Sequence, residues 1–359
     1  MPAQRSRRKA AKLALLATMR QSGVMGATKE SAWRSRRLLI LAYHGIALRD
    51  EHEFAPELYL PVSALRHRFN LLRDGGYTVV SLREALRRLS DGSLPPRAVA
   101  LTFDDGMHDF AEAVVPLLEE FRYPATVYVT TYYAAKEAPI FRMACRYLLW
   151  VARGRTIDGT DLTTTGEPLH LESEPEREAA RVAIEARLER LSGGLAEELV
   201  TLQRLAGRIG VDFGAFMADR RLRVMSPDEI SSLPEMVDVQ LHTHRHRVPL
   251  DREAFRQEIE DNRQALQAWR PRAVLDGFCY PSGITNARFL PWLAELGVTT
   301  ATTCRAGLVS PRSDPLMLPR LVDSWRMTEL ELQGWLTGIS NFLPQIPTFS
   351  RYQAASQYD

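Results

Sequence analysis

The sequence has little cysteine, no long apolar run and almost no net charge. Its three cysteines among 359 residues are odd in number and widely spaced, so they predict neither a disulfide framework nor a zinc cage, and they favour a reducing compartment. No window approaches the roughly 20 apolar residues of a membrane-spanning helix. The composition, with 45% apolar and 25% charged residues, is that of a globular protein. One large α/β domain with an insertion is sufficient for this length.

The net charge of +2 conceals a basic N-terminal segment. Residues 1–37 contain ten lysines and arginines against a single acid, Glu30, so this leader carries +9 and the rest of the chain −7. Such a leader is typical of a segment that lies on an anionic membrane, or of a frayed and solvated terminus, and both interpretations stay open. Its apolar residues favour a membrane over a nucleic acid, and no nucleic-acid partner is predicted. These residues are Leu13, Leu15, Leu16, Met19, Val24 and Met25.

A cleaved secretion signal is a weaker interpretation of the leader. The apolar run Leu13–Met19 is short, is interrupted by Ala and Thr, and ends at Arg20 without a clear small-residue cleavage site. We therefore expect a cytoplasmic protein, peripheral on the inner face of the membrane if the leader binds lipid, rather than a secreted or periplasmic one.

Strand patterns alternate with amphipathic helix patterns over the rest of the chain. This alternation predicts a mainly parallel α/β sheet or barrel, whose active site is expected at the carboxyl ends of the strands. The predicted strands are Leu38–Tyr43, Ala98–Phe103, Ala125–Thr130, Val237–Leu241, Val274–Tyr280, Val298–Thr303 and Leu316–Val322. The predicted helices are Val62–Asp74, Ser81–Leu89, Phe110–Phe121, Ser226–Leu233, Asp251–Trp269, Asn286–Leu296 and Glu329–Thr337.

The alternation breaks at about residues 131–224. We interpret this segment as an insertion into a domain that spans residues 38–340 and is followed by a tail at 341–359. Its patterns are three helices, Pro139–Trp150, Pro175–Leu191 and Ala196–Ile209, and a hairpin, Thr156–Leu171. Because the insertion follows a strand end, it is suited to cover the substrate as a lid or acceptor platform. A packing or dimerisation appendage is an equally open interpretation.

Two adjacent carboxylates follow one of the predicted strands. Asp104 and Asp105 come directly after Ala98–Phe103 and before Gly106. Neighbouring side chains on a strand point to opposite faces, but the glycine lets the backbone turn, so both acids can reach one pocket. One carboxylate can then bind a metal while the other moves a proton.

Three histidines provide the second half of the expected site. His242, His244 and His246 follow the predicted strand Val237–Leu241. Two of them, with one aspartate, can form a metal site with three protein ligands. His242 and His244 share a face on an extended strand, whereas His242 pairs with His246 if the chain turns after His244. The residues alone leave the second histidine ligand open.

The segments Thr102–Gly106 and His242–His246 resemble the first two motifs of the polysaccharide deacetylases, the NodB-like group also called carbohydrate esterase family 4. The resemblance covers most of the chain apart from the leader and the insertion. It implies a distorted (β/α) barrel with a mainly helical insertion. It also implies a hydrolase that removes acetyl groups from an N-acetylated saccharide with a divalent metal, Zn²⁺ being favoured over Ni²⁺ or Co²⁺.

The same resemblance implies a role for each residue of the two motifs. Asp105 resembles the metal-binding carboxylate, with His242 and His246 as its partners, because the family spacing matches this wider histidine pair. Asp104 resembles the general base. Thr243 would orient the loop or contact the substrate through a hydrogen bond.

The third family motif is altered in this chain. Family members often carry Arg-Pro-Pro-Tyr-Gly, whereas residues 278–283 read Phe-Cys-Tyr-Pro-Ser-Gly. Cys279 stands where an arginine pairs with the catalytic aspartate, and Ser282 replaces the tyrosine. A backbone amide near Ser282 can still face the oxyanion, and Tyr280 is a further candidate on the substrate side. Arg320 is the candidate partner of the base; its alternative is an exposed arginine at a strand end.

The late histidine that many family members use as the acid is absent, because no histidine follows His246. Tyr43-His44-Gly45, after the first predicted strand, resembles instead the permuted branch typified by the poly-N-acetylglucosamine deacetylases. This resemblance implies that His44 protonates the leaving amine; otherwise it only holds the loop. His108 is expected to cap the next helix and has no role in the site.

Two other functions remain open. An amidase or esterase that acts on another acylated small molecule would use the same residues. A glycan-binding relic would keep the fold without catalysis, although the presence of Asp104 and of every metal ligand argues against it.

Overall fold

The structure is a computed structural model that describes residues 2–136, 138–191 and 193–344. It divides into two compact units. The first consists of Met1–Tyr132 and Pro227–Asp359, and the second of Tyr133–Ser226. The predicted tail, apart from its first four residues, lies outside the described residues.

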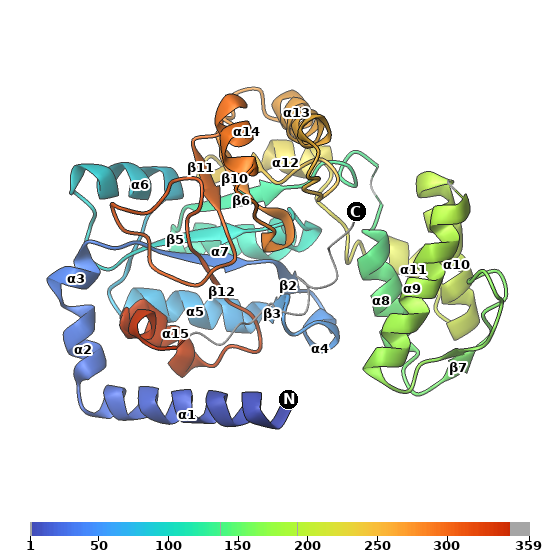
Figure 1. Ribbon diagram of the computed structural model, residues 1–359, viewed down its shortest axis with the longest axis horizontal. Coiled ribbons are helices and arrows are strands. Elements are labelled where there is room, and N and C mark those ends of the chain that lie inside the picture. The colour runs from blue at the N-terminus through green and yellow to red at the C-terminus, as the bar shows by residue number, and fades with distance from the viewer. Residues whose placement is uncertain (1, 137, 192, 345–359) are drawn as a thin grey trace. The chain divides into compact units, whose positions relative to one another are not determined.

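The first unit is built on an eight-stranded sheet in which all paired strands are parallel (Figure 1). The strand order is β11-β10-β9-β6-β5-β1-β12, and β4 pairs with β5. A parallel bridge joins Thr302 on β11 to Leu318, just before β12, so the two ends of the sheet curl toward each other as in a distorted barrel. The strands are β1 (Leu39–Tyr43), β4 (Thr78–Val79), β5 (Ala98–Phe103), β6 (Ala125–Val129), β9 (Val237–Leu241), β10 (Gly277–Cys279), β11 (Thr300–Thr302) and β12 (Leu321–Val322).

Helices alternate with these strands, and polar side chains set where several of them begin. Ser81 caps α6 and Asp251 caps α13 through their side-chain oxygens. Thr328 and Glu331 form a capping box at the start of α15. The helices are α4 (Glu51–Phe54), α5 (Val62–Asp74), α6 (Leu82–Asp91), α7 (Val115–Phe121), α12 (Pro227–Ser232), α13 (Arg252–Trp269), α14 (Phe289–Glu295) and α15 (Glu329–Leu336), with 3₁₀ turns η2 (Pro281–Gly283) and η3 (Ile339–Phe342).

The core of the first unit lies around the central strands. Every residue of β1, β5 and β6 is buried, as expected for parallel strands that are covered on both faces. One apolar cluster joins residues of these strands to α6. It consists of Leu38, Ile40, Leu82, Ala85, Leu89, Ala98, Ala100, Tyr128, Cys279, Val309 and Leu318.

Three predicted strands are shorter than expected. The strand predicted at Val298–Thr303 is reduced to β11. The strand predicted at Val274–Tyr280 is reduced to β10, and Val274 is largely exposed. The strand predicted at Leu316–Val322 is reduced to β12, because Pro319 has no N–H to donate and interrupts the ladder.

Among the short elements that were not predicted are β4, α4, a π-helical turn and a parallel strand pair. The helix expected at Phe110–Phe121 begins as a π-helical turn, η1 (Phe110–Val114), and continues as α7, since Pro116 cannot donate a helical hydrogen bond. A parallel pair, β2 (Gly45–Ala47) and β3 (Tyr59–Pro61), lies between His44 and α5. Three-residue strands carry too little pattern to be recognised in a sequence.

The basic leader is helical and packs on the barrel. It forms α1 (Pro2–Gln21), α2 (Val24–Lys29) and α3 (Ala32–Ser35), and α1 lies against α15 (Figure 1). Leu16 and Met25 are buried in a cluster with Ile339, so they are not available to a lipid surface, whereas Leu15 and Val24 are exposed. The frayed terminus is thus the wrong interpretation. Among the described residues, no helix has both the length and the apolar content needed to cross a bilayer.

Arg34 fastens the leader to the barrel. Its guanidinium is fully buried and donates to the carbonyl oxygens of Leu336, Arg37 and Ala98 at 2.9, 2.6 and 3.2 Å. Burial lowers the pKa of Arg34 to about 10, so the side chain stays charged at neutral pH. One side chain therefore joins α3 to the end of α15 and the start of β5.

The second unit is mainly helical, as predicted for the insertion. Its helices α8 and α10 pack together, and α9 packs on α8. Each of these helices buries apolar side chains, such as Leu148, Ile184 and Leu202. The elements are α8 (Phe141–Val151), β7 (Thr156–Ile157), β8 (Leu169–His170), α9 (Glu174–Leu191), α10 (Gly194–Ile209) and α11 (Phe213–Ala218), and β7 and β8 form an antiparallel pair.

Candidate metal and catalytic site

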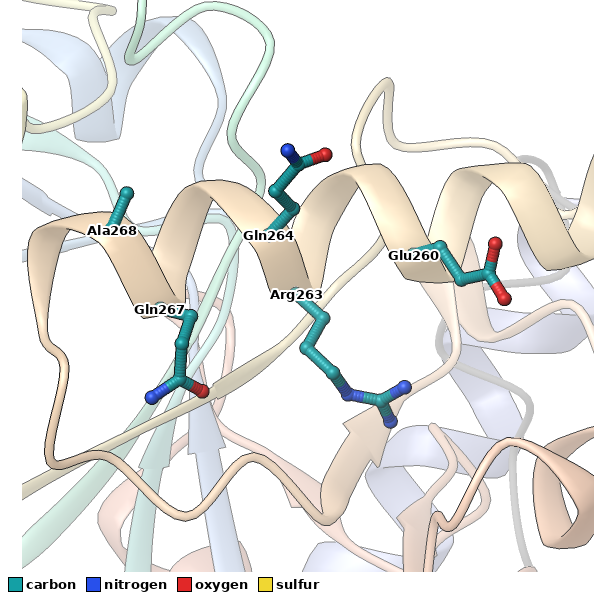
Figure 2. Close-up of a pocket in the computed structure, with 5 residues that line it drawn as sticks. All are labelled: Glu260, Arg263, Gln264, Gln267 and Ala268. Carbon is teal, nitrogen blue, oxygen red and sulfur yellow. The ribbon is translucent and has the colours of Figure 1, made fainter.

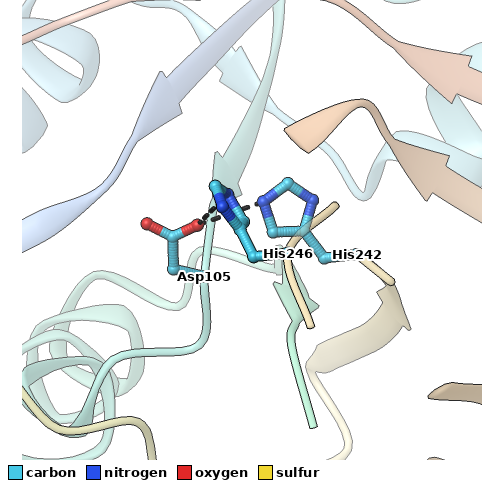
Figure 3. A group of neighbouring side chains, drawn as sticks. All are labelled: Asp105, His242 and His246. Carbon is cyan, nitrogen blue, oxygen red and sulfur yellow. Dashed lines mark hydrogen bonds and ion pairs between the residues drawn. The ribbon is translucent and has the colours of Figure 1, made fainter. Parts of the chain in front are cut away.

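Asp105, His242 and His246 meet at the carboxyl ends of β5 and β9. One ligand atom of each side chain lies within 4.8 Å of the others. His242 Nε2 is 3.1 Å and His246 Nε2 3.2 Å from the same oxygen, Asp105 Oδ1. Figure 3 shows both imidazoles directed at this oxygen. The side chains suit a divalent metal, because all three donors face a common point.

Unusual backbone angles bring these side chains together. Asp105 has φ 70° and Gly106 φ 71°, so the chain turns sharply at the end of β5. A Cβ on Gly106 would lie 2.9 Å from a methyl of Val129, which excludes a larger residue there. Thr243, with φ 62°, accepts a hydrogen bond from the Arg247 amide through Oγ1 at 3.0 Å. Thr243 therefore orders the turn of the histidine loop.

His242 is held in the orientation that a metal ligand needs. Its Nδ1–H donates to the carbonyl oxygen of Cys279 at 2.8 Å, and its backbone amide donates to Asn262 Oδ1 at 3.0 Å. Because Nδ1 is used in this hydrogen bond, Nε2, which faces Asp105, is the ring nitrogen that is available to a metal. Burial opposes protonation, but the hydrogen bond and charge of Asp105 outweigh it and raise the pKa of His242.

His244 faces away from the cluster. Its Nδ1 lies 2.9 Å from Thr131 Oγ1, and its carbonyl oxygen accepts hydrogen bonds from the Tyr132 amide and the Thr130 hydroxyl. The structure thus brings His246 rather than His244 beside Asp105.

Asp104 is paired with Arg320. The guanidinium donates from Nη1 to Oδ1 and from Nη2 to Oδ2, both at 2.7 Å, and both side chains are buried. Arg320 is therefore not an exposed strand-end residue. Burial alone would raise the pKa of Asp104, but the charge and hydrogen bonds of Arg320 lower it below its usual value, so the carboxylate is ionised and can accept a proton.

His44 lies beside this ion pair. Its Nε2 is 3.8 Å from Asp104 Oδ2, and the side chain is 15% exposed. Burial lowers the pKa of His44, although Asp104 and Asp105 oppose this shift. The loop after His44 is anchored by the Ile46 amide, which donates to the buried carboxylate of Asp109 at 3.0 Å.

The loop of the third motif, residues 278–283, does not place Tyr280 on the substrate side as predicted. Tyr280 is buried, and its hydroxyl donates to the carbonyl oxygen of Leu316 at 3.0 Å, so the structure places this side chain in the core instead of at the cluster. Ser282 is exposed, with φ 54°. Gly283 has φ 67°, and a Cβ there would lie 2.9 Å from Cβ of Cys304.

Several residues near the site were missed or misassigned. His108 does not cap the next helix; its Nδ1 lies 2.8 Å from Glu229 Oε1. Asn262 and Glu258 of α13 hold the histidine loop, since Glu258 Oε2 accepts from the Arg245 amide at 2.7 Å. An amphipathic pattern marks α13 as a helix but does not indicate what its buried polar residues contact.

A separate hollow lies along α13. Figure 2 shows that its lining side chains all come from this helix. They are Glu260, Arg263, Gln264, Gln267 and Ala268. None of the predicted site residues lines it, so this hollow has no part in the candidate chemistry.

Part of the chain is similar in sequence to known deacetylases. The polysaccharide deacetylase family matches residues 91–157, which include Asp104 and Asp105. The poly-beta-1,6-N-acetyl-D-glucosamine N-deacetylase of Escherichia coli (strain K12) is 36% identical over 99 residues, which cover 27% of this chain and only 14% of that relative.

Solved structures resemble the fold over most of the chain. The Streptococcus pyogenes deacetylase PplD in complex with acetate has a TM-score of 0.54 and 18% identity, covering 86% of this chain and 99% of that one. IcaB from Ammonifex degensii has a TM-score of 0.52 and 16% identity, covering 84% and 97%. The predicted α/β barrel-like fold is thereby confirmed.

Proposed function

We propose that the chain is a metal-dependent hydrolase of the polysaccharide deacetylase family, to which residues 91–157 are similar, and that it removes acetyl groups from an N-acetylated saccharide. The observation that supports this most is the cluster of Asp105, His242 and His246 beside the buried Asp104–Arg320 pair. This arrangement places three metal donors next to an ionised carboxylate, which is what hydrolysis of an amide by an activated water requires.

Asp105, His242 and His246 would hold the metal. Their fit is supported by the hydrogen bond from His242 Nδ1 to the Cys279 carbonyl, which orients Nε2. A divalent ion bound there would polarise the acetyl carbonyl and make a water more acidic. We propose Zn²⁺, with Ni²⁺ or Co²⁺ as alternatives, since imidazole and carboxylate ligands suit all three.

Asp104 acts as the general base in this proposal. It takes a proton from the attacking water, and Arg320 keeps the carboxylate ionised and fixes its two oxygens. An amide of the loop near Ser282 would donate a hydrogen bond to the developing oxyanion.

His44 supplies the proton to the leaving amine. Its burial lowers its pKa, so the imidazole is mostly neutral before the reaction and must gain a proton during it. Its position 3.8 Å from Asp104 supports a path in which the proton taken by Asp104 reaches the amine through His44.

The proposed substrate is a saccharide with N-acetylglucosamine units, such as poly-β-1,6-N-acetylglucosamine. Its support is the E. coli relative, of which the match spans 14%. A cytoplasmic location, proposed from the leader, would direct the enzyme to a lipid-linked or other intracellular saccharide precursor. Cell fractionation tests this location, and protein found in the periplasm or medium would contradict it.

The activity is tested by incubating the metal-loaded protein with a panel of N-acetylated oligosaccharides and lipid-linked sugars and measuring acetate release. Asp104→Asn, which keeps the shape of the base but not its charge, should lose most activity. Unchanged release by this variant would refute the mechanism. Release only from acylated non-sugars would favour an amidase or esterase, and saccharide binding without release would favour a relic.

A further inference from the structure

The Arg320 guanidinium has a sulfur neighbour. Nη2 lies 3.0 Å from Cys279 Sγ, in addition to its bond to Asp104. The other donors are also occupied, because Nη1 reaches Thr102 Oγ1 at 3.1 Å and Nε reaches the Thr303 carbonyl at 3.0 Å. Nη2 carries two N–H groups. One of them donates to Asp104, and the thiol of Cys279 accepts the other.

Cys279 suits this contact in size and in charge. An uncharged thiol can accept a hydrogen bond from the guanidinium without competing with Asp104 for its positive charge. An arginine at position 279 would instead bring a second cation against Arg320 in a buried site. A small neutral acceptor at position 279 is therefore compatible with an arginine at position 320, whereas a second arginine is not.

Cys279 also contacts the metal cluster. Its carbonyl oxygen accepts the Nδ1–H of His242 at 2.8 Å, while its side chain accepts from Arg320. The last residue of β10 thus joins the histidine ligand to the partner of the base.

We propose that Cys279 is a positioning residue, whose thiol holds Arg320 Nη2 and thereby orients the Asp104 carboxylate for proton transfer. This inference rests on the proposed deacetylase function. Cys304 has a lesser part, because its Sγ lies 4.0 Å from the same nitrogen and its Cβ abuts Gly283.

Three variants of the full-length protein test the proposal by acetate release. Loss of a hydrogen bond to a charged group predicts that Cys279→Ala lowers kcat about 10- to 100-fold, with KM and bound metal changed by less than about twofold. Cys279→Ser restores an acceptor and should recover most of kcat. Cys145→Ala, which removes a fully buried thiol from α8, is the matched control and should keep wild-type kcat.

Wild-type kcat in a folded Cys279→Ala variant would overturn the proposal. So would a Cys279→Ser variant as slow as Cys279→Ala, or an equal loss in Cys145→Ala. If the wild type releases no acetate from any substrate, the proposed function fails, and the contact is tested by a double-mutant cycle of urea unfolding. Coupling between Cys279→Ala and Arg320→Lys would support the thiol contact, and additive effects would overturn it.

Discussion

Asp104 and Arg320 are 216 residues apart in the sequence and form a buried ion pair through two hydrogen bonds of 2.7 Å. Asp104 directly follows β5 and Arg320 directly precedes β12, and these strands are not neighbours, because β1 lies between them. The side chains therefore meet inside the curled sheet, where each charge has little water and depends on the other.

Replacing Arg320 tests this dependence. Arg320→Met leaves the Asp104 carboxylate buried without its cation, so we expect a loss of about 3–5 kcal/mol in the free energy of unfolding and of most deacetylation. Arg320→Lys keeps the charge but lacks the planar fork, and it should lose less stability than Arg320→Met. Urea unfolding and acetate release measure both effects; equal stability of all three proteins would contradict the pairing.

The metal cluster distinguishes among the three histidines of its loop. We expect His242→Ala and His246→Ala to lose at least about 100-fold in affinity for Zn²⁺, because each removes one of three donors. His244→Ala is the matched control, since His244 bonds Thr131 instead, and should bind within about tenfold of wild type. Titration calorimetry measures this, and a ranking that places His244 among the essential residues would refute the assignment.

Asn262 should affect the metal without touching it. Its amide nitrogen donates to the Val129 carbonyl and to Thr131 Oγ1, and its oxygen accepts from the His242 amide. Asn262→Ala is expected to weaken metal binding about 10- to 100-fold, the usual effect of removing a support for a ligand. Gln264→Ala, which removes an exposed amide from the same helix, is the control and should leave metal affinity unchanged. If both variants lose metal affinity equally, the loss comes from a disturbed α13 and not from the Asn262 hydrogen bonds.

The leader offers a matched pair of leucines. Leu16 is fully buried whereas Leu15 is 42% exposed. Leu16→Ala should therefore lower the free energy of unfolding by about 2–5 kcal/mol, while Leu15→Ala should change it by less than about 1 kcal/mol. Thermal or urea unfolding decides this, and equal effects would show that α1 is not packed on α15.

Stability should depend on pH through Asp323. Burial raises its pKa to about 6, above the value near 4 of an unfolded aspartate. Between these values the folded protein retains a proton that the unfolded chain has lost, so this contribution to stability is complete below about pH 4 and disappears as pH rises through about 6. The shift corresponds to about 3 kcal/mol.

Comparison with Asp323→Asn isolates this contribution. The difference in unfolding free energy between wild type and variant, measured in urea from pH 4 to pH 7, should change by about that amount in favour of the variant. A difference that is constant across this range would show that Asp323 has an ordinary pKa in the folded protein.

The sequence predicted the order of strands and helices because regular elements depend on local patterns of apolar residues and caps. The bounds of β1, α5, β5 and β9 lie within one residue of those predicted. The prediction from the sequence was less accurate where an element is short or contains proline, as at β10, β12 and the π-helical turn. Such segments form through contacts with distant strands rather than through their own periodicity.

For the site, the chemical types of the residues and their places at strand ends could be read from the sequence: two adjacent carboxylates, a group of histidines and an upstream His44. Which of these side chains meet follows from tertiary contacts. The fold directs His246 to Asp105 and His244 away, buries Tyr280, and brings Arg320 within hydrogen-bonding distance of both Asp104 and Cys279. These choices depend on backbone turns with positive φ and on contacts between residues far apart in the chain, which no local pattern encodes.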